Sequence, residues 1–334
     1  MIEKQRDFGP GLCQATFADI WAELERRVNA VIDEFYEPPT PVGLYPHFNE
    51  LALRGTMLAA VPELAVVRKR ATELFAAGYG AIVIDDLHLL GRAPAQRNRL
   101  LYALFLALGF PTPSTQRQST LLWDVKARSV PGDRPATYSE HSAEADLHTD
   151  SQGYPVPEET FALYVVHAAR CGGGASTFLC AEPLCETLAA TAQGREALEV
   201  LGSHKFPFSL QPGESVGPGA LTFAPILGDA PRIRFRRDVI EHGFQVQPEA
   251  APAEARAAFA FLLHILAHAA PVSTYAMADG AIVLCNNHTL LHGRTAFTDP
   301  ERHLLRARMS SRPVALNVAA FLQQNPAFAK AMVG

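Results

Sequence analysis

The chain has 334 residues, of which 48% are hydrophobic and 19% are charged, so it can bury a sizeable core and does not have the composition of a disordered protein. A formal net charge of −5 argues against a nucleic-acid-binding surface, and the basic pairs Arg26-Arg27 and Arg236-Arg237 are interpreted as solvated. The absence of a signal peptide or of an apolar run of about 18 residues, together with five cysteines but no CxxC motif, indicates a reduced, cytoplasmic protein without a membrane span.

The first part of the chain is predicted to be mostly helical. Apolar residues at helical spacing predict one helix over residues 15–36 and another over 62–77. A short buried strand over 81–84 follows, and then a third helix over 94–109 that begins with proline and ends at glycine. We expect residues 1–110 to pack as a helical part against the core.

Strands dominate the prediction after residue 120. Ser273–Met277 and Ala281–Cys285 are expected to pair as a hairpin that turns at Asp279-Gly280. Early helices and late strands suit a single domain over 1–334, mainly β with flanking helices. Further strands are expected over 121–125, 145–150, 161–166, 232–236 and 302–309, further helices over 182–193, 252–270 and 315–334, and no assignment is made for 203–230.

The most informative motif is Leu147-His148-Thr149-Asp150, followed far downstream by Leu291-His292-Gly293-Arg294. In an extended segment, residues i and i+2 project to the same side, so His148 and Asp150 can point at one metal ion. Two histidines and one carboxylate can occupy one face of an octahedral ferrous ion and leave three positions open for substrate and O₂. The pattern therefore predicts that His148, Asp150 and His292 bind a metal ion.

Three further features accompany this motif. Leu290-Leu291 precede His292, as expected for a buried strand, and Arg302 and Arg306 follow it. A turn, Gly172-Gly173-Gly174, leads into hydroxyl residues and an apolar run. Together these residues resemble the iron(II)/2-oxoglutarate dioxygenases of the taurine dioxygenase and clavaminate synthase group, most clearly over residues 137–185 and 279–310.

The resemblance implies a double-stranded β-helix, or jelly roll, as the core over residues 120–310. It also implies Fe(II), 2-oxoglutarate and O₂ as cofactor and cosubstrates, with succinate and CO₂ as products and a C–H bond of the substrate oxidised. Arg302 would bind the distal carboxylate of 2-oxoglutarate, helped by the hydroxyl of Ser176 or Thr177. Arg306 would lie nearer the prime substrate.

The sequence departs from the usual pattern of this group at Asn286-Asn287, where relatives usually have Asp-Asn. Asparagine still offers hydrogen bonds to a strand end, so altered tuning around the metal is expected rather than loss of iron. Arg306 and the acidic stretch from Glu140 to Asp146 suggest a small polar substrate, such as an amino acid or a derivative that carries a carboxylate. A solvated loop is the alternative interpretation of that acidic stretch.

Two other functions remain open from the sequence. A zinc or manganese hydrolase could use the same three ligands, but it would give Arg302 and Arg306 no role. A non-catalytic jelly-roll binding protein is the second alternative. The sequence indicates neither the identity of the substrate nor the oligomeric state.

Overall fold

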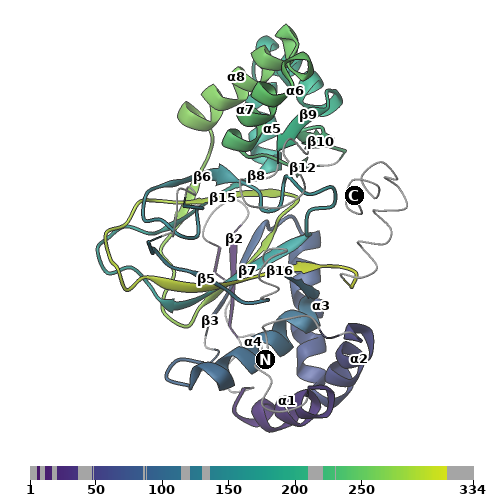
Figure 1. Cartoon of the computed structure of the whole chain (residues 1–334), viewed down its shortest axis with the longest axis vertical. Coiled ribbons are helices and arrows are strands. Elements are labelled where there is room, and N and C mark those ends of the chain that lie inside the picture. The colour runs from purple at the N-terminus through teal and green to yellow at the C-terminus, as the bar shows by residue number, and fades with distance from the viewer. Residues whose placement is uncertain are drawn as a thin grey trace.

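Two β-sheets lie face to face in the computed structural model, and each carries helices on its outer side (Figure 1). The succession of layers is therefore helices, larger sheet, smaller sheet, helices. The structure describes residues 6–7, 12–16, 21–36, 47, 49–85, 87, 89–113, 121–129, 136–209, 221–229 and 231–313.

The larger sheet has eight strands in the order β1-β2-β3-β14-β7-β16-β4, with β5 also paired to β16. All of its pairs are antiparallel except β2 with β3. Its strands are β1 (Arg6–Asp7), β2 (Leu12–Thr16), β3 (Ala81–Asp85), β4 (Phe110–Thr112), β5 (Trp123–Val125), β7 (Thr160–His167), β14 (Ile282–Asn286) and β16 (His303–Ser310).

The smaller sheet has four antiparallel strands in the order β13-β8-β15-β6. In the β6–β15 pair, His148 lies directly opposite His292, and the register shifts just beyond this point. The register therefore sets two predicted metal ligands side by side. The strands are β6 (Ala145–His148), β8 (Ser176–Cys180), β13 (Ser273–Tyr275) and β15 (Leu290–Arg294).

Helices cover both outer faces. The larger sheet is covered by α1 (Trp21–Phe35), α2 (Glu50–Ala60), α3 (Pro62–Ala76) and α4 (Pro94–Leu108). The smaller sheet is covered by α5 (Ala181–Ala189), α6 (Ala192–Ser203), α7 (Arg237–Val246), the 3-10 turn η1 (Pro248–Ala250) and α8 (Ala253–His268). Two short strand pairs accompany this second layer: β9 (Phe206–Ser209) with β10 (Leu221–Ala224), and β11 (Leu227–Gly228) with β12 (Arg232–Ile233).

The alternation of side chains along the strands explains why both faces of each sheet are apolar. Ile82 and Ile84 of β3 pack under helices α1–α4, whereas Ala81 and Val83 pack between the two sheets. Because successive side chains point to opposite faces, a strand covered on both sides must be apolar throughout. This accounts for the unbroken apolar run that identified β3 in the sequence.

The prediction of a mainly β chain is only partly confirmed. Antiparallel sheets with flanking helices are present, but eight α-helices lie among the described residues, so the chain is a mixed α and β protein. The difference comes mainly from residues 181–268, where four helices with their own apolar core follow β8. Sequence periodicity indicated only two helical segments there, and the first of them, 182–193, matches α5 and only the start of α6.

The predicted hairpin over 273–285 is wrong. Gly280 does turn the chain, with φ +81°, but Ser273–Tyr275 pairs with β8 in the smaller sheet. Ile282–Asn286 pairs with β3 and β7 in the larger sheet. The turn therefore connects the two sheets, which local alternation cannot distinguish from a hairpin.

Several helix boundaries also differ from those predicted. The first helix begins at Trp21 rather than at residue 15, because Leu12–Thr16 pairs with β3. The helix over 182–193 is two helices, and Thr191 caps the second by accepting the Gly194 N–H at 3.0 Å. The α2 helix and α7 were not predicted, and the predicted strand over 232–236 is only two residues long.

The predicted helices over 62–77, 94–109 and 252–270 are confirmed to within about two residues at either end. The predicted C-terminal helix over 315–334 lies outside the described residues. Within the described part of the chain, none of the helices has the length and apolar character needed to cross a bilayer.

Candidate active site

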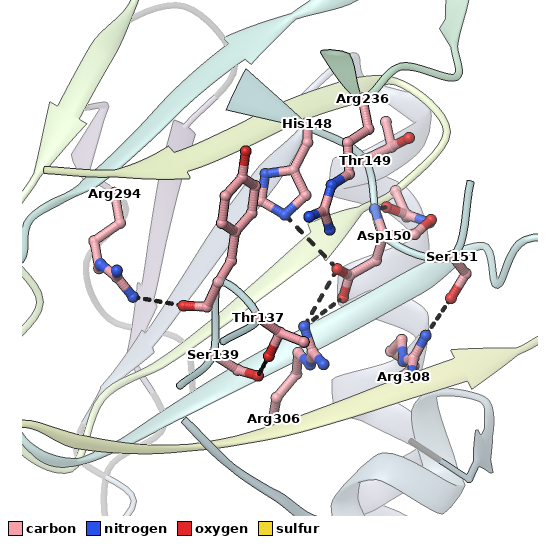
Figure 2. A network of polar contacts seen from close by, with 12 residues as sticks. Thr137, Ser139, His148, Thr149, Asp150, Ser151, Arg236, Arg294, Arg306 and Arg308 are labelled. Carbon is pink, nitrogen blue, oxygen red and sulfur yellow. Dashed lines mark hydrogen bonds and ion pairs between the residues drawn. The ribbon is translucent and has the colours of Figure 1, made fainter. Parts of the chain in front are cut away.

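His148, Asp150 and His292 come together between the two sheets. His148 ends β6, and the ring of His292 on β15 packs against Phe161 of the larger sheet, with ring centroids 4.2 Å apart. Asp150 returns to the side of His148 while Thr149 points away (Figure 2). One donor atom of each of the three lies within 4.8 Å of the others, and His148 Nε2 is 3.9 Å from Asp150 Oδ1. The predicted ligand set therefore forms one compact cluster.

Both histidines of this cluster are neutral at pH 7. Burial lowers the pKa of His148 well below its usual value, and burial lowers the pKa of His292 to about 4. His148 Nδ1 lies 2.7 Å from the carbonyl oxygen of Asp146, to which it can only donate, so Nε2 keeps its lone pair. A neutral imidazole with one nitrogen tied to a carbonyl is the form that binds a metal ion.

Asp150 is ionised although it is only 6% exposed. Burial alone would raise its pKa, but the charges of Arg306 and other nearby groups hold that pKa below its usual value. Arg306 Nη1 lies 3.2 Å and 3.3 Å from the two carboxylate oxygens. Asp150 Oδ2 accepts no hydrogen bond within the described structure, so one buried lone pair is available. Two neutral imidazoles and a carboxylate are donors that suit ferrous iron.

The backbone of Asp150 is held by Asn287. The Asn287 side chain accepts the Asp150 N–H at 2.7 Å and donates to the carbonyls of Asp150 at 3.0 Å and Glu158 at 2.8 Å. Asn286 accepts the N–H of His288 at 3.1 Å. The expected hydrogen bonding of the asparagine pair to a strand end is therefore present, and Asn287 joins β14–β15 to the metal-binding segment.

Arg302 is a buried cation beside a small pocket between the sheets. It is 4% exposed and lines the pocket with Val165, Met277 and Leu304. Its Nη1 has no hydrogen-bond partner in the described structure, Nη2 makes one long contact of 3.4 Å with the Gly174 carbonyl, and the guanidinium lies over a phenylalanine ring. Burial lowers its pKa to about 9, so it remains charged at pH 7. A buried charge of this kind needs an anion.

The glycine run beside Arg302 has a steric cause. Gly174 adopts φ +77°, and a Cβ there would lie 2.9 Å from Arg302 Nε. At Gly173 a Cβ would lie 2.2 Å from the carbonyl oxygen of Ala296. The turn can therefore pack against Arg302 only without side chains.

Ser176 and Thr177, the two candidate hydroxyl residues, lie on opposite faces of β8. Ser176 lies on the same face of β8 as Phe178 and Cys180, which pack between the sheets, and it is 4% exposed. Thr177 lies on the opposite face with Leu179, which packs under the outer helices, and its Oγ1 lies next to Gly293. Ser176 is thus the member that shares the inter-sheet face.

Arg306 and Arg308 follow Leu304 at two-residue intervals on the inner face of β16. Arg306 contacts Asp150, and Arg308 donates to the hydroxyl of Ser151 (Figure 2). Among the described non-glycine residues, Ser151 alone has a positive φ, of 57°. Arg308 and Ser151 were not predicted as site residues, although the spacing of Arg308 from Arg306 places both arginines on one face of a strand.

The acidic stretch before His148 is not an open acidic surface. Glu140 is 4% exposed, pairs with Arg128 at 3.1 Å, and accepts from the N–H and hydroxyl of Thr137. Arg294 holds the same loop by donating to the carbonyls of Tyr138, His141 and Ala143. Glu140 is therefore already partnered, while Glu144 and Asp146 are exposed.

The interpretation of Arg236-Arg237 as a solvated pair is half right. Arg237 is exposed and pairs with Glu241 at 2.8 Å. The Arg236 side chain is only 12% exposed, and its guanidinium lies 4.2 Å from the ring centre of Tyr138, next to His148. Neither Arg236 nor Tyr138 was predicted as a site residue, because nothing in their local sequence pattern marks them as neighbours of the metal cluster.

Three solved structures illustrate the similarity of the fold to known proteins. An asparagine oxygenase in complex with Fe(II), 2S,3S-3-hydroxyasparagine and succinate has a TM-score of 0.64 at 19% identity, covering 89% of this chain and 93% of that one. The non-heme iron oxygenase OrfP with Fe and alpha-ketoglutaric acid has a TM-score of 0.64 at 16% identity, covering 90% and 94%. OrfP with Fe, succinate and (3R,4R)-dihydroxy-L-Arg gives 0.62 at 17% identity, with the same coverage of 90% and 94%.

At these identities the three structures establish similarity of fold. No match was found among curated proteins. The sequence model described as Taurine catabolism dioxygenase TauD, TfdA family matches residues 58–308, which is more than half of the chain and includes every candidate site residue. The chain therefore belongs to the TauD/TfdA dioxygenase family.

Proposed function

We propose that the protein is an iron(II)- and 2-oxoglutarate-dependent dioxygenase that oxidises a C–H bond of a small polar substrate, most simply by hydroxylation. The observation that carries the proposal is the buried cluster of two neutral histidines and an ionised aspartate. A metal-dependent hydrolase would use the same donors, but it would leave Arg302 as a buried cation with no function.

Each residue has a defined part in this proposal. His148, Asp150 and His292 hold Fe(II), and Arg302 binds the distal carboxylate of 2-oxoglutarate in a charge-assisted pair. When bound, iron, 2-oxoglutarate and O₂ supply the oxidising chemistry. Arg306 keeps Asp150 ionised and oriented through its contacts with both carboxylate oxygens.

A hydroxyl group is the second contact proposed for 2-oxoglutarate. Ser176 is favoured over Thr177 because it shares the face of β8 that packs between the sheets. The apolar side chains of that inter-sheet cluster would exclude water from the reacting groups.

For the fold, we infer a double-stranded β-helix core over residues 120–310 in a single domain over 1–334. The two facing sheets and the match over 58–308 support this inference. Residues 1–110 form the helical part on one side, and the helices of 181–268 are an insertion on the other. A cytoplasmic location stays a prediction.

The proposed substrate is an amino acid or an amino-acid derivative. The structural neighbours support this class, since one was crystallised with a hydroxylated asparagine and another with a hydroxylated arginine. An arginine whose guanidinium lies on the ring that contacts His148 supplies a cation that suits a substrate carboxylate.

The test is a succinate-release assay with Fe(II), O₂ and 2-oxoglutarate, each omitted in turn, against a panel of free amino acids, small carboxylates and carrier-bound aminoacyl groups. We expect succinate only when all three are present. His292→Ala should lose both bound iron and turnover, because it removes one of three protein ligands, whereas His268→Ala, at an exposed histidine of α8, should behave as the wild type. Full 2-oxoglutarate turnover by His292→Ala would refute the ligand assignment.

A further inference from the structure

Residues 234 and 235, in the outer helical layer, are hydrogen-bonded to the segment that carries His148 and Asp150. The Thr149 N–H donates to the Phe235 carbonyl at 2.8 Å, and the Phe235 N–H donates to Thr149 Oγ1 at 3.1 Å. Arg234 donates to the carbonyls of Gln152 at 2.8 Å and Tyr154 at 2.6 Å. Because Thr149 lies between two metal ligands, this pairing fixes the next residue of the helical layer, Arg236, beside the metal cluster.

The Arg236 guanidinium is supported on two sides. Its Nε and Nη2 donate to the two carboxylate oxygens of Asp238 at 2.7 Å and 2.9 Å. Its plane lies over the ring of Tyr138 at 4.2 Å, and the same ring makes an edge contact with His148, with centroids 4.8 Å apart. These contacts orient a planar cation before any ligand arrives.

The position of Arg236 is next to the reacting centre. In Figure 2 its guanidinium lies between His148 and Asp150, on the side of the cluster opposite Arg306. The helical insertion therefore contributes a positive charge to the candidate active site.

The other charged groups near the cluster already have partners of their own. Arg306 is paired with Asp150 through both carboxylate oxygens, and Glu140 is paired with Arg128. Asp238, the acid that holds Arg236, has a side chain that is 54% exposed, so solvent screens much of its charge. Arg236 thus brings the cluster a cation whose described ion-pair partner, Asp238, lies half in solvent.

We propose that Arg236, resting on Tyr138, binds a carboxylate of the prime substrate. The inference deepens the proposed dioxygenase function and rests on it. Arg306 was the residue expected to contact the substrate, but its contacts with Asp150 make it a positioning residue for the metal ligand. The substrate carboxylate would then enter from the side of α7 and lie over His148.

The test compares acids with their primary amides. L-Asparagine, L-arginine and L-glutamate, each paired with its α-carboxamide, are titrated calorimetrically into the protein loaded with Fe(II) and 2-oxoglutarate without O₂. We expect at least one acid to bind about tenfold or more tightly than its amide, since the amide cannot form a charge-assisted pair.

Arg236→Gln should weaken binding of that acid roughly 30-fold and binding of the amide by less than about threefold, so that the discrimination is lost. Arg236→Lys should retain part of it. Arg237→Gln is the matched control, because the neighbouring arginine is exposed and pairs with Glu241. This control should bind both members of each pair as the wild type does.

The assignment would be overturned if Arg236→Gln still preferred the acid over its amide as strongly as the wild type does, whether or not Arg306→Gln lost that preference. It would also be overturned if no acid bound to the wild type. A rise in the KM for 2-oxoglutarate in Arg236→Gln, in place of a change in acid binding, would place the cosubstrate there instead and would also overturn it. Failure of the dioxygenase proposal itself looks different, because the wild type would then form no succinate from 2-oxoglutarate in the presence of iron and O₂.

Discussion

Replacing Arg302 with methionine should separate ligand binding from folding. Arg302 is 4% exposed, and within the described structure its polar contact is one long hydrogen bond to the Gly174 carbonyl, with the Phe297 ring beneath it at 4.8 Å. Its charge is therefore buried without a carboxylate until a ligand supplies one. Methionine keeps much of the aliphatic volume and removes the charge.

The loss of 2-oxoglutarate affinity can be estimated from the lost ion pair. A charge-assisted pair in a buried site contributes on the order of 2–4 kcal/mol, so Arg302→Met should weaken 2-oxoglutarate binding roughly 30- to 1000-fold. The free energy of unfolding of the ligand-free protein should stay the same or rise, because an unpaired buried charge is removed. The substitution should therefore damage binding without damaging the fold.

Thermal unfolding under anaerobic conditions with Fe(II), with and without 2-oxoglutarate, measures both effects together. At a concentration about 100-fold above the wild-type Kd, 2-oxoglutarate stabilises the wild type by about 2.7 kcal/mol, and a variant that binds about 100-fold more weakly by only about 0.4 kcal/mol. Arg54→Met is a matched control, since Arg54 also lies over a phenylalanine ring, at 4.5 Å, but belongs to α2 in the other helical layer. An Arg302→Met protein with a lowered melting temperature and an unchanged KM for 2-oxoglutarate would refute this reasoning.

Three further predictions concern Asn287 and the cysteines. Asn287→Ala removes the two hydrogen bonds that hold the backbone of Asp150 and a third to the Glu158 carbonyl, so iron affinity should fall by about 10- to 100-fold in a metal titration; unchanged affinity would show that Asp150 does not depend on this support. Cys171 is exposed, and backbone N–H groups lower its pKa to about 7, so iodoacetamide should label it half-maximally near pH 7 and faster above, where the thiolate dominates. Cys180 and Cys285 are buried, and burial raises the pKa of both, so mass spectrometry should find them unmodified in the folded protein; earlier labelling of Cys285 would contradict the structure.

Local sequence information was sufficient where one segment determines its own geometry. The i and i+2 spacing of His148 and Asp150 places both on one side of an extended chain, and the structure has them there. The α4 helix was predicted to within a residue because proline and glycine bound its apolar run. The pairing of His292 with His148 could not be derived in this way, since the 141 residues between Asp150 and His292 carry no information about register.

Local information failed where the partner strand or layer decides the outcome. Ser273–Tyr275 and Ile282–Asn286 alternate as hairpin strands would, yet they join different sheets. Arg236 and Arg237 are indistinguishable in the sequence, but the pairing of Phe235 with Thr149 turns the first toward the metal cluster and leaves the second in solvent. The distinguishing contact lies 86 residues away along the chain.

The chemistry of this chain follows from which face of each strand lies between the two sheets. On β8 that face carries Ser176, and on β16 it carries Arg306 and Arg308, whereas Thr177 and Leu305 point toward helices. A shift of register by one residue in either strand would exchange the polar residues for residues of the opposite face. The helical layers, by making the outer faces apolar, therefore fix the register that brings the arginines to Asp150 and Ser151, and the candidate active site depends on them although they contribute few of its side chains.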